Sequence, residues 1–137
     1  MKTKIKYRSG YKYQLAKTFE IGTRILPPKK VSMDFIVLSR QGKLTIKRNY
    51  AWDGQSGPTI DTKNFMRGSL VHDALYQLMR LKLLPMSYRE GADMELDRIC
   101  KLDGMSRIRR WYVLRSLRRF GASAANPENK KKLLEAP

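Results

Sequence analysis

The segment FMRGSLVHDALYQLMRL, residues Phe65–Leu81, decides the fold of this chain. Its apolar residues recur every three or four positions, which is the spacing of one face of an α-helix. Polar residues fall between them, so the segment predicts a helix that packs one broad face against the rest of the protein. That face comprises Leu70, Val71, Ala74, Leu75, Leu78 and Met79.

Two further helices are expected after this segment. Pro85 interrupts the chain, and Ser87–Glu90 has the Ser-x-x-Glu pattern of a capping box, which predicts a second helix running to about Leu102. Because the connection is short, the first two helices should form an antiparallel hairpin. A third helix is expected over Ser106–Phe120, with core positions at Ile108, Trp111, Leu114 and Leu117.

The N-terminal half has the patterns of β-strands. Lys4–Tyr7 and Tyr11–Leu15 alternate polar and apolar residues, and Phe35–Leu38 is a short apolar strand. A glycine turn at Arg40–Lys43 leads into a returning strand over residues 44–52. One face of that strand is expected to carry Leu44, Ile46, Arg48, Tyr50 and Trp52.

These elements predict an α+β fold in which an N-terminal antiparallel sheet or hairpin precedes three helices. A chain of 137 residues has room for one modest core, so we expect a single domain over residues 1–120. It is β-rich over residues 1–60 and helical over residues 64–120. Residues 121–137 are small, polar and basic, and are expected to form a mobile tail.

Charge is distributed unevenly along the chain. The formal net charge is +17, from 29 Lys and Arg against 12 Asp and Glu. Residues 1–52 carry +11 and residues 104–137 carry +7, whereas residues 53–103 carry −1. The carboxylates of the middle segment indicate metal binding, acid–base chemistry or an ordinary helix surface. The basic flanks fit nucleic acid, an anionic lipid surface or other proteins of an assembled particle.

Several features bear on the compartment. No stretch has the run of about 18 apolar residues that a membrane-spanning helix needs. The lysines of residues 1–8 lead into no apolar segment, so we expect no cleaved secretion signal. The single Cys100 excludes an internal disulfide and a multi-cysteine zinc site, and favours a reducing compartment.

A candidate site lies on the predicted helical hairpin. His72 and Tyr76 are four residues apart and share one helix face, and Asp93 lies at a comparable distance beyond the turn. Antiparallel packing should therefore bring Asp93 opposite His72. A histidine held by a carboxylate has a fixed tautomer and is suited to deprotonate water, and Tyr76 can hold that carboxylate in place. The same contact can also be purely structural, because polar networks satisfy buried groups.

A metal site is expected beside this cluster. Asp73 projects about a quarter-turn away from His72, toward the glycine-containing loop that begins with Asp53 and Gly54. Carboxylate and backbone carbonyl oxygens are ligands that suit Ca²⁺ better than zinc. A cation there would polarise a substrate carbonyl.

The segment His72-Asp73-Ala-Leu-Tyr76, followed 17 residues later by Asp93, resembles the H-D-x-x-Y … D signature of phospholipase A₂, in the style of its cysteine-poor bacterial and parvoviral branches. The resemblance implies that His72 activates water and that Asp93 orients the His72 side chain. It also implies that Tyr76 supports Asp93 and that Asp73 binds calcium. The Asp53-Gly-x-Ser segment likewise resembles the calcium-loop region of bacterial members.

A second resemblance covers residues 44–120. The series D-G-x-S-x-P, V-H-D-x-L-Y and A-D is similar to an uncharacterised family of tailed phages and prophages. It implies a phage origin, with the host cytoplasm or the virion as location. We therefore expect a phage-encoded hydrolase-like protein that cleaves phospholipid esters with Ca²⁺ assistance. The alternatives are a non-catalytic phage structural or accessory protein with a relic His/Asp dyad, and a non-specific nucleic-acid binder.

Overall fold

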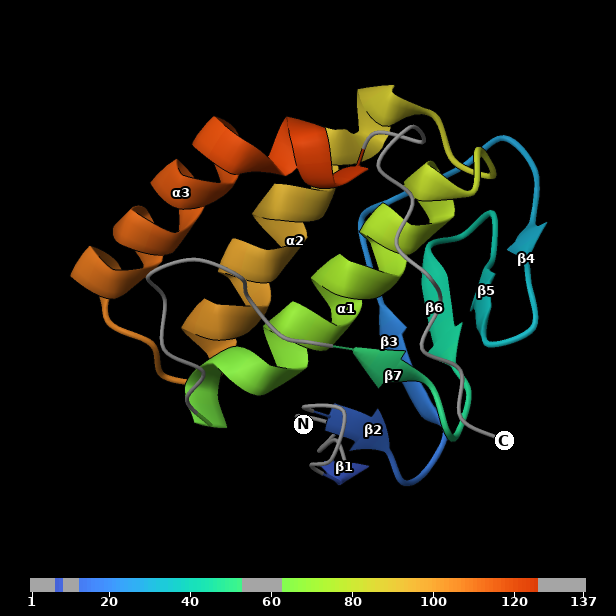
Figure 1. Cartoon of the computed structure of the whole chain (residues 1–137), viewed down its shortest axis with the longest axis horizontal. Coiled ribbons are helices and arrows are strands. Elements are labelled where there is room, and N and C mark those ends of the chain that lie inside the picture. Colours follow the sequence, from blue (N-terminus) through green and yellow to red (C-terminus); the bar gives the residue numbers. More distant parts are fainter. Residues whose placement is uncertain (1–6, 9–12, 53–62, 126–137) are drawn as a thin grey trace.

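The structure is a computed structural model that describes residues 7–8, 13–52 and 63–125. In this part of the chain two antiparallel sheets precede three helices, which confirms the predicted α+β class (Figure 1). The three-stranded sheet has the order β1-β2-β7 and the four-stranded sheet has the order β3-β6-β5-β4. Their bounds are β1 Tyr7–Arg8, β2 Tyr13–Leu15, β3 Phe19–Gly22, β4 Val31–Ser32, β5 Ile36–Leu38, β6 Lys43–Ile46 and β7 Ala51–Trp52.

The helices follow the expected order. Helix α1 covers Lys63–Arg80, α2 covers Arg89–Leu102 and α3 covers Arg107–Ala125, with a short 3₁₀ helix, η1, over Met86–Tyr88. Ser87 lies inside η1, and α2 begins after Tyr88 without a side-chain cap. The predicted capping box is therefore wrong, because the 3₁₀ turn after the proline makes Tyr88 the N-cap, and Ser87 lies one residue too early. Helix α3 also continues five residues past the predicted end, into the segment expected to be a tail.

The predicted returning strand is divided into two. Its first part, β6, pairs with β3 and β5, and its second part, β7, pairs with β2 of the other sheet. Asn49 between them has φ 78°, a left-handed conformation that ends regular strand pairing. Arg48 is exposed in this turn and does not share the buried face of the strand. The turn thus carries the chain from one sheet to the other.

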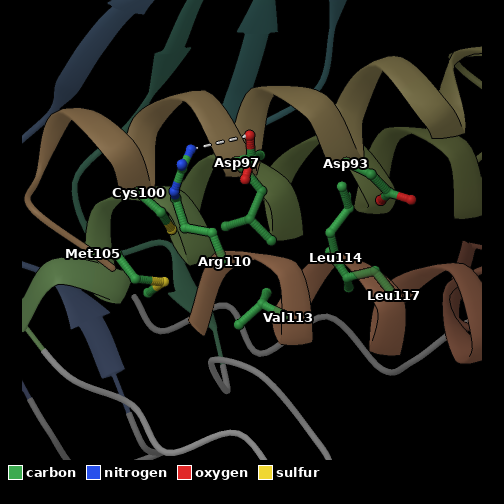
Figure 2. A pocket seen from close by; sticks show the side chains of 9 residues that line it. Asp93, Asp97, Cys100, Met105, Arg110, Val113, Leu114 and Leu117 are labelled. Atoms are coloured by element: carbon green, nitrogen blue, oxygen red, sulfur yellow. Dashed lines mark hydrogen bonds and ion pairs between the residues drawn. The ribbon is translucent and has the colours of Figure 1, made fainter. Parts of the chain in front are cut away.

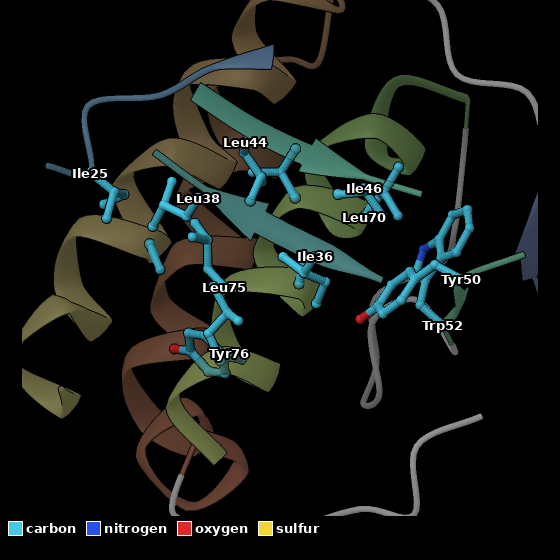
Figure 3. Close-up of a cluster of buried hydrophobic side chains, with 14 of the residues drawn as sticks. Ile25, Ile36, Leu38, Leu44, Ile46, Tyr50, Trp52, Leu70, Leu75 and Tyr76 are labelled. Atoms are coloured by element: carbon cyan, nitrogen blue, oxygen red, sulfur yellow. The ribbon is translucent and has the colours of Figure 1, made fainter. Parts of the chain in front are cut away.

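The main core lies between the four-stranded sheet and α1. Side chains of β5 and β6, among them Leu38 and Leu44, face Leu70 and Leu75 of α1 (Figure 3). Trp52, from β7, also belongs to this core and is 1% exposed. Helix α2 packs beside α1, and α3 packs against α2 on the side away from the sheet (Figure 1). A smaller apolar cluster joins the three helices and comprises Phe65, Leu96, Cys100, Met105, Val113 and Leu117.

Helix α3 does not bury all four of the residues that were predicted to be its core positions. Val113 and Leu117 are buried, whereas Ile108 is 81% exposed and Trp111 is 59% exposed. The four predicted core residues are spaced by three, and a helix of 3.6 residues per turn rotates such a series by about 60° at each step. The first and last members therefore point in opposite directions, and only one end of the series reaches the core.

Helix α2 is also tied to the N-terminal half through Glu95, which is 2% exposed. Its carboxylate accepts a hydrogen bond from the backbone N–H of Arg24 at 3.2 Å and pairs with Arg98 at 2.8 Å. Arg98 in turn donates to the backbone carbonyl of Gly22 at 3.0 Å. These contacts connect α2 to the end of β3 and the segment that follows it.

Candidate active site

The predicted meeting of His72 and Asp93 is present between α1 and α2. The Nε2 atom of His72 lies 2.7 Å from Oδ1 of Asp93, and both side chains are buried. With Asp93 ionised, its oxygens can only accept hydrogen bonds, so Nε2 carries the proton in the neutral imidazole. The lone pair of the ring is then on Nδ1, the atom from which His72 can act as a base.

Tyr76 supports the same carboxylate oxygen. Its hydroxyl donates to Oδ1 of Asp93 at 2.6 Å, and its ring centroid lies 4.0 Å from that of His72. Burial of the phenol, followed by its hydrogen bond to Asp93, raises the pKa of Tyr76 far above its ordinary value. The Tyr76 phenol therefore stays protonated near neutral pH and can donate this hydrogen bond.

Arg89 is a further neighbour that the sequence analysis did not single out. Its Nη1 atom lies 4.0 Å from Oδ2 of Asp93, one helical turn earlier on α2. The two oxygens of the carboxylate thus face different groups: Oδ1 faces His72 and Tyr76, and Oδ2 faces a guanidinium. The four-residue spacing of Arg89 and Asp93 is the signal that could have revealed this pair.

The Nδ1 atom of His72 has no hydrogen-bond partner among the residues that the structure describes. The histidine itself is 7% exposed, and Asp93 is 1% exposed. The arrangement therefore consists of a held and oriented imidazole with one nitrogen available, set just below the surface. Chemically, such a group can take a proton from water and return it to a leaving group.

Asp73 occupies a different environment from Asp93. Its Oδ2 accepts a hydrogen bond from the Tyr50 hydroxyl at 2.6 Å, and its Oδ1 lies 3.8 Å from Nη2 of Arg80. The Asp73 side chain is 23% exposed. It faces the segment that precedes β7, whereas His72 faces α2. Adjacent residues on α1 therefore serve two separate polar clusters.

The described residues around Asp73 do not supply a calcium shell. The carboxylate is bound by a phenol and lies near a guanidinium, and no group of three His, Cys, Asp or Glu suited to a metal occurs in residues 13–52 and 63–125. The other predicted ligands, Asp53 and Gly54, lie outside the described residues. Calcium binding stays a prediction.

An apolar groove runs between α2 and α3 (Figure 2). Arg110 lies 3.4 Å from Asp97 across it. Asp93 stands at one end, but its carboxylate points away from the other lining side chains (Figure 2). The groove and the His72 cluster therefore lie on different sides of α2. The remaining lining residues are Leu96, Cys100, Met105, Val113, Leu114 and Leu117.

Comparisons with family models, with curated proteins and with solved structures each found no match. No helix in the described part of the chain is long and apolar enough to cross a membrane.

Proposed function

We propose that this chain is a phage-encoded hydrolase that cleaves a carboxylic ester of a phospholipid, in the manner of phospholipase A₂. One observation carries the proposal: Oδ1 of Asp93 lies within hydrogen-bond distance of both His72 Nε2 and the Tyr76 hydroxyl. For His72, Asp93 and Tyr76, these contacts are the ones that the H-D-x-x-Y … D resemblance leads us to expect. The arrangement also orients Nδ1 of His72 as the free base.

The reaction begins with a water molecule at Nδ1 of His72. The imidazole takes one proton from the water as its oxygen attacks the ester carbonyl carbon, which gives a tetrahedral intermediate. The intermediate then expels the alcohol oxygen, which receives the proton from the imidazolium. The products are a free fatty acid and a lysophospholipid. His72 ends the cycle in its starting state, so no covalent enzyme intermediate is formed.

Asp93 and Tyr76 are positioning residues in this scheme. Asp93 fixes the tautomer of His72 and stabilises the imidazolium while the proton is on the ring. Tyr76 keeps the carboxylate oxygen aligned through a hydrogen bond, and burial raises the pKa of this phenol so that it stays protonated near neutral pH. The predicted calcium ion, if bound at Asp73, would supply polarisation of the ester carbonyl.

The test is hydrolysis of phospholipid vesicles by the purified full chain. His72→Ala and Asp93→Ala should each lower the rate by about 10²–10⁴-fold, the range contributed by general base catalysis. Asp97→Ala is the matched control, because Asp97 lies four residues beyond Asp93 on α2 and pairs instead with Arg110. A folded wild-type protein without turnover, or a His72→Ala variant with the wild-type rate, would overturn the proposal.

Calcium is tested in the same assay with a chelator. The calcium prediction requires that chelation abolishes hydrolysis and that added Ca²⁺ restores it. If hydrolysis persists in chelator, calcium is excluded while the His72 proposal stands. Calcium titration followed by the tryptophan fluorescence of the wild type and Asp73→Asn provides a readout that does not depend on turnover.

A second candidate is a non-catalytic phage structural or accessory protein in which the dyad is a relic. The observation that favours it is burial, since His72 and Asp93 are 7% and 1% exposed. The cluster would then serve only to hold α1 on α2. This candidate predicts that His72→Ala lowers the melting temperature and that the wild type hydrolyses no ester.

A further inference from the structure

Helix α3 carries an exposed face that combines large apolar side chains with arginines. Ile108, Trp111 and Tyr112 are 81%, 59% and 43% exposed. Their positions place them on one side of the helix, opposite Val113 and Leu117, which face the core. Exposed arginines flank them. We call this surface the outer face of α3, and it consists of Arg107, Ile108, Trp111, Tyr112, Arg115 and Arg118.

This surface is not accounted for by the fold. Helix α3 forms the layer farthest from the sheet, and its buried side already contacts α2 (Figure 1). Single exposed apolar residues are common, but a cluster of them bordered by charge is typical of a binding surface. The aromatic and aliphatic side chains of the outer face therefore indicate a partner with an apolar component.

The charges of the outer face indicate that this partner is anionic. Residues 107–125 contain six arginines and no acidic residue. The Arg115 guanidinium lies 5.4 Å from the centroid of the Trp111 ring, which holds a cation beside an exposed indole. Of the described outer-face arginines, Arg118 also pairs at the surface with Glu90, at 3.3 Å. Arg107 and Arg115 are therefore the arginines best placed to meet an anion.

We propose that the outer face of α3 docks the protein on an anionic phospholipid bilayer. Ile108 and Trp111 enter the boundary between headgroups and acyl chains, and Arg107 and Arg115 pair with lipid phosphates. The most exposed member of the face is aliphatic. An isoleucine gains free energy in a bilayer but adds little to binding of nucleic acid, which relies on cations and on stacking of aromatic rings.

This inference extends the proposed function, because docking would deliver the ester bond to the enzyme. Docking can nevertheless be measured independently of hydrolysis. The assay is binding of the full chain to vesicles of phosphatidylcholine alone or mixed with phosphatidylglycerol. We expect strong binding only to the anionic vesicles. The double variants Ile108→Ser/Trp111→Ser and Arg107→Gln/Arg115→Gln should each weaken it by at least about tenfold.

Tryptophan fluorescence gives a second readout. Trp52 is 1% exposed and Trp111 is 59% exposed, so a change in emission on docking comes from Trp111. Anionic vesicles should shift the emission of the wild type to shorter wavelength and protect it from a soluble quencher. The variant Trp111→Phe should lose the shift while it retains most of the binding. Leu26→Ser is the matched apolar control, because Leu26 is also 59% exposed but lies outside α3.

The outcomes separate this inference from the proposed reaction. His72→Ala should bind vesicles as the wild type does. Binding without hydrolysis would overturn only the hydrolase proposal, whereas hydrolysis that does not depend on the outer face would overturn only the docking proposal. Unchanged vesicle binding in both double variants overturns docking at this face. The docking proposal is also overturned if the wild type binds DNA but no vesicles and the double variants lose this DNA binding. It is likewise overturned if the wild type self-associates through these residues.

Discussion

Helices α1 and α2 meet through a glycine at one end of their interface and through polar side chains at the other. At the first end, a Cβ atom on Gly68 would lie 2.7 Å from Cδ1 of Leu96 and 2.9 Å from Sγ of Cys100. One helical turn along α1, His72 approaches Asp93 to 2.7 Å. A hydrogen bond tolerates only a few tenths of an ångström, so the apolar end sets the helix separation that the polar end needs.

Removal of the central carboxylate should have the largest effect on this interface. Asp93→Ala leaves His72 Nε2 and the Tyr76 hydroxyl buried without their acceptor, and should lower the free energy of unfolding by about 2–5 kcal/mol. Denaturant unfolding measures the change, with Asp97→Ala as the control at a partly buried carboxylate on the same helix. A loss below about 0.5 kcal/mol would show that the polar end contributes little to stability.

The apolar end is tested by the same substitution at two helical glycines. Gly68→Ala should be less stable than Gly91→Ala by about 1–3 kcal/mol, because the new methyl group overpacks against Leu96 and Cys100. At Gly91 the methyl group meets only the flexible end of Ile25, at 3.0 Å. Both variants gain the same helix propensity, which cancels in the comparison. Equal stabilities would mean that the helices separate freely at Gly68.

The two tyrosines that bind aspartates provide a smaller contrast. Tyr76→Phe removes a hydrogen bond to a buried carboxylate and should cost about 1–2 kcal/mol, with a measurable loss of any hydrolytic activity. Tyr50→Phe removes a hydrogen bond to Asp73, whose side chain is 23% exposed and can recruit water instead. We expect it to cost less than about 1 kcal/mol. Thermal unfolding of both variants under identical conditions gives the comparison.

The smallest effect concerns the reactivity of Cys100. Burial raises the pKa of its thiol to about 12, so the native protein should react with a thiol reagent only when the helices packed around Cys100 separate. Gly68→Ala should accelerate labelling because it wedges this end apart. Tyr76→Phe should leave the rate near that of the wild type. Rapid labelling of the native wild type would contradict the packing around Gly68.

Much of the site could be predicted because helical spacing is regular. Two residues four apart share a helix face, and a short connection makes two helices antiparallel. The proximity of His72, Tyr76 and Asp93 could therefore be predicted from the sequence. The partners of Asp73 could not be predicted in this way. Tyr50 comes from a turn whose geometry depends on Asn49, and sequence patterns describe such turns poorly.

The third helix shows where periodicity misleads. Ile108 and Trp111 follow an apolar spacing, yet they are exposed, because only Val113 and Leu117 reach the smaller core. Apolar residues occur on both sides of α3, so sequence alone does not choose between them. The choice is made by the shape of the surface that α1 and α2 offer.

The hydrogen bonds between α2 and the end of β3 bear on whether the helices could fold without the N-terminal half. Arg24 and Gly22 lie far from α2 in the sequence. The backbone N–H of Arg24 nevertheless donates to the Glu95 carboxylate, and the backbone carbonyl of Gly22 accepts from the Arg98 guanidinium. If the helices were excised, part of this bonding would be lost and Glu95 would lose its backbone donor. We therefore expect the excised helices to be less stable than the same helices in the full chain.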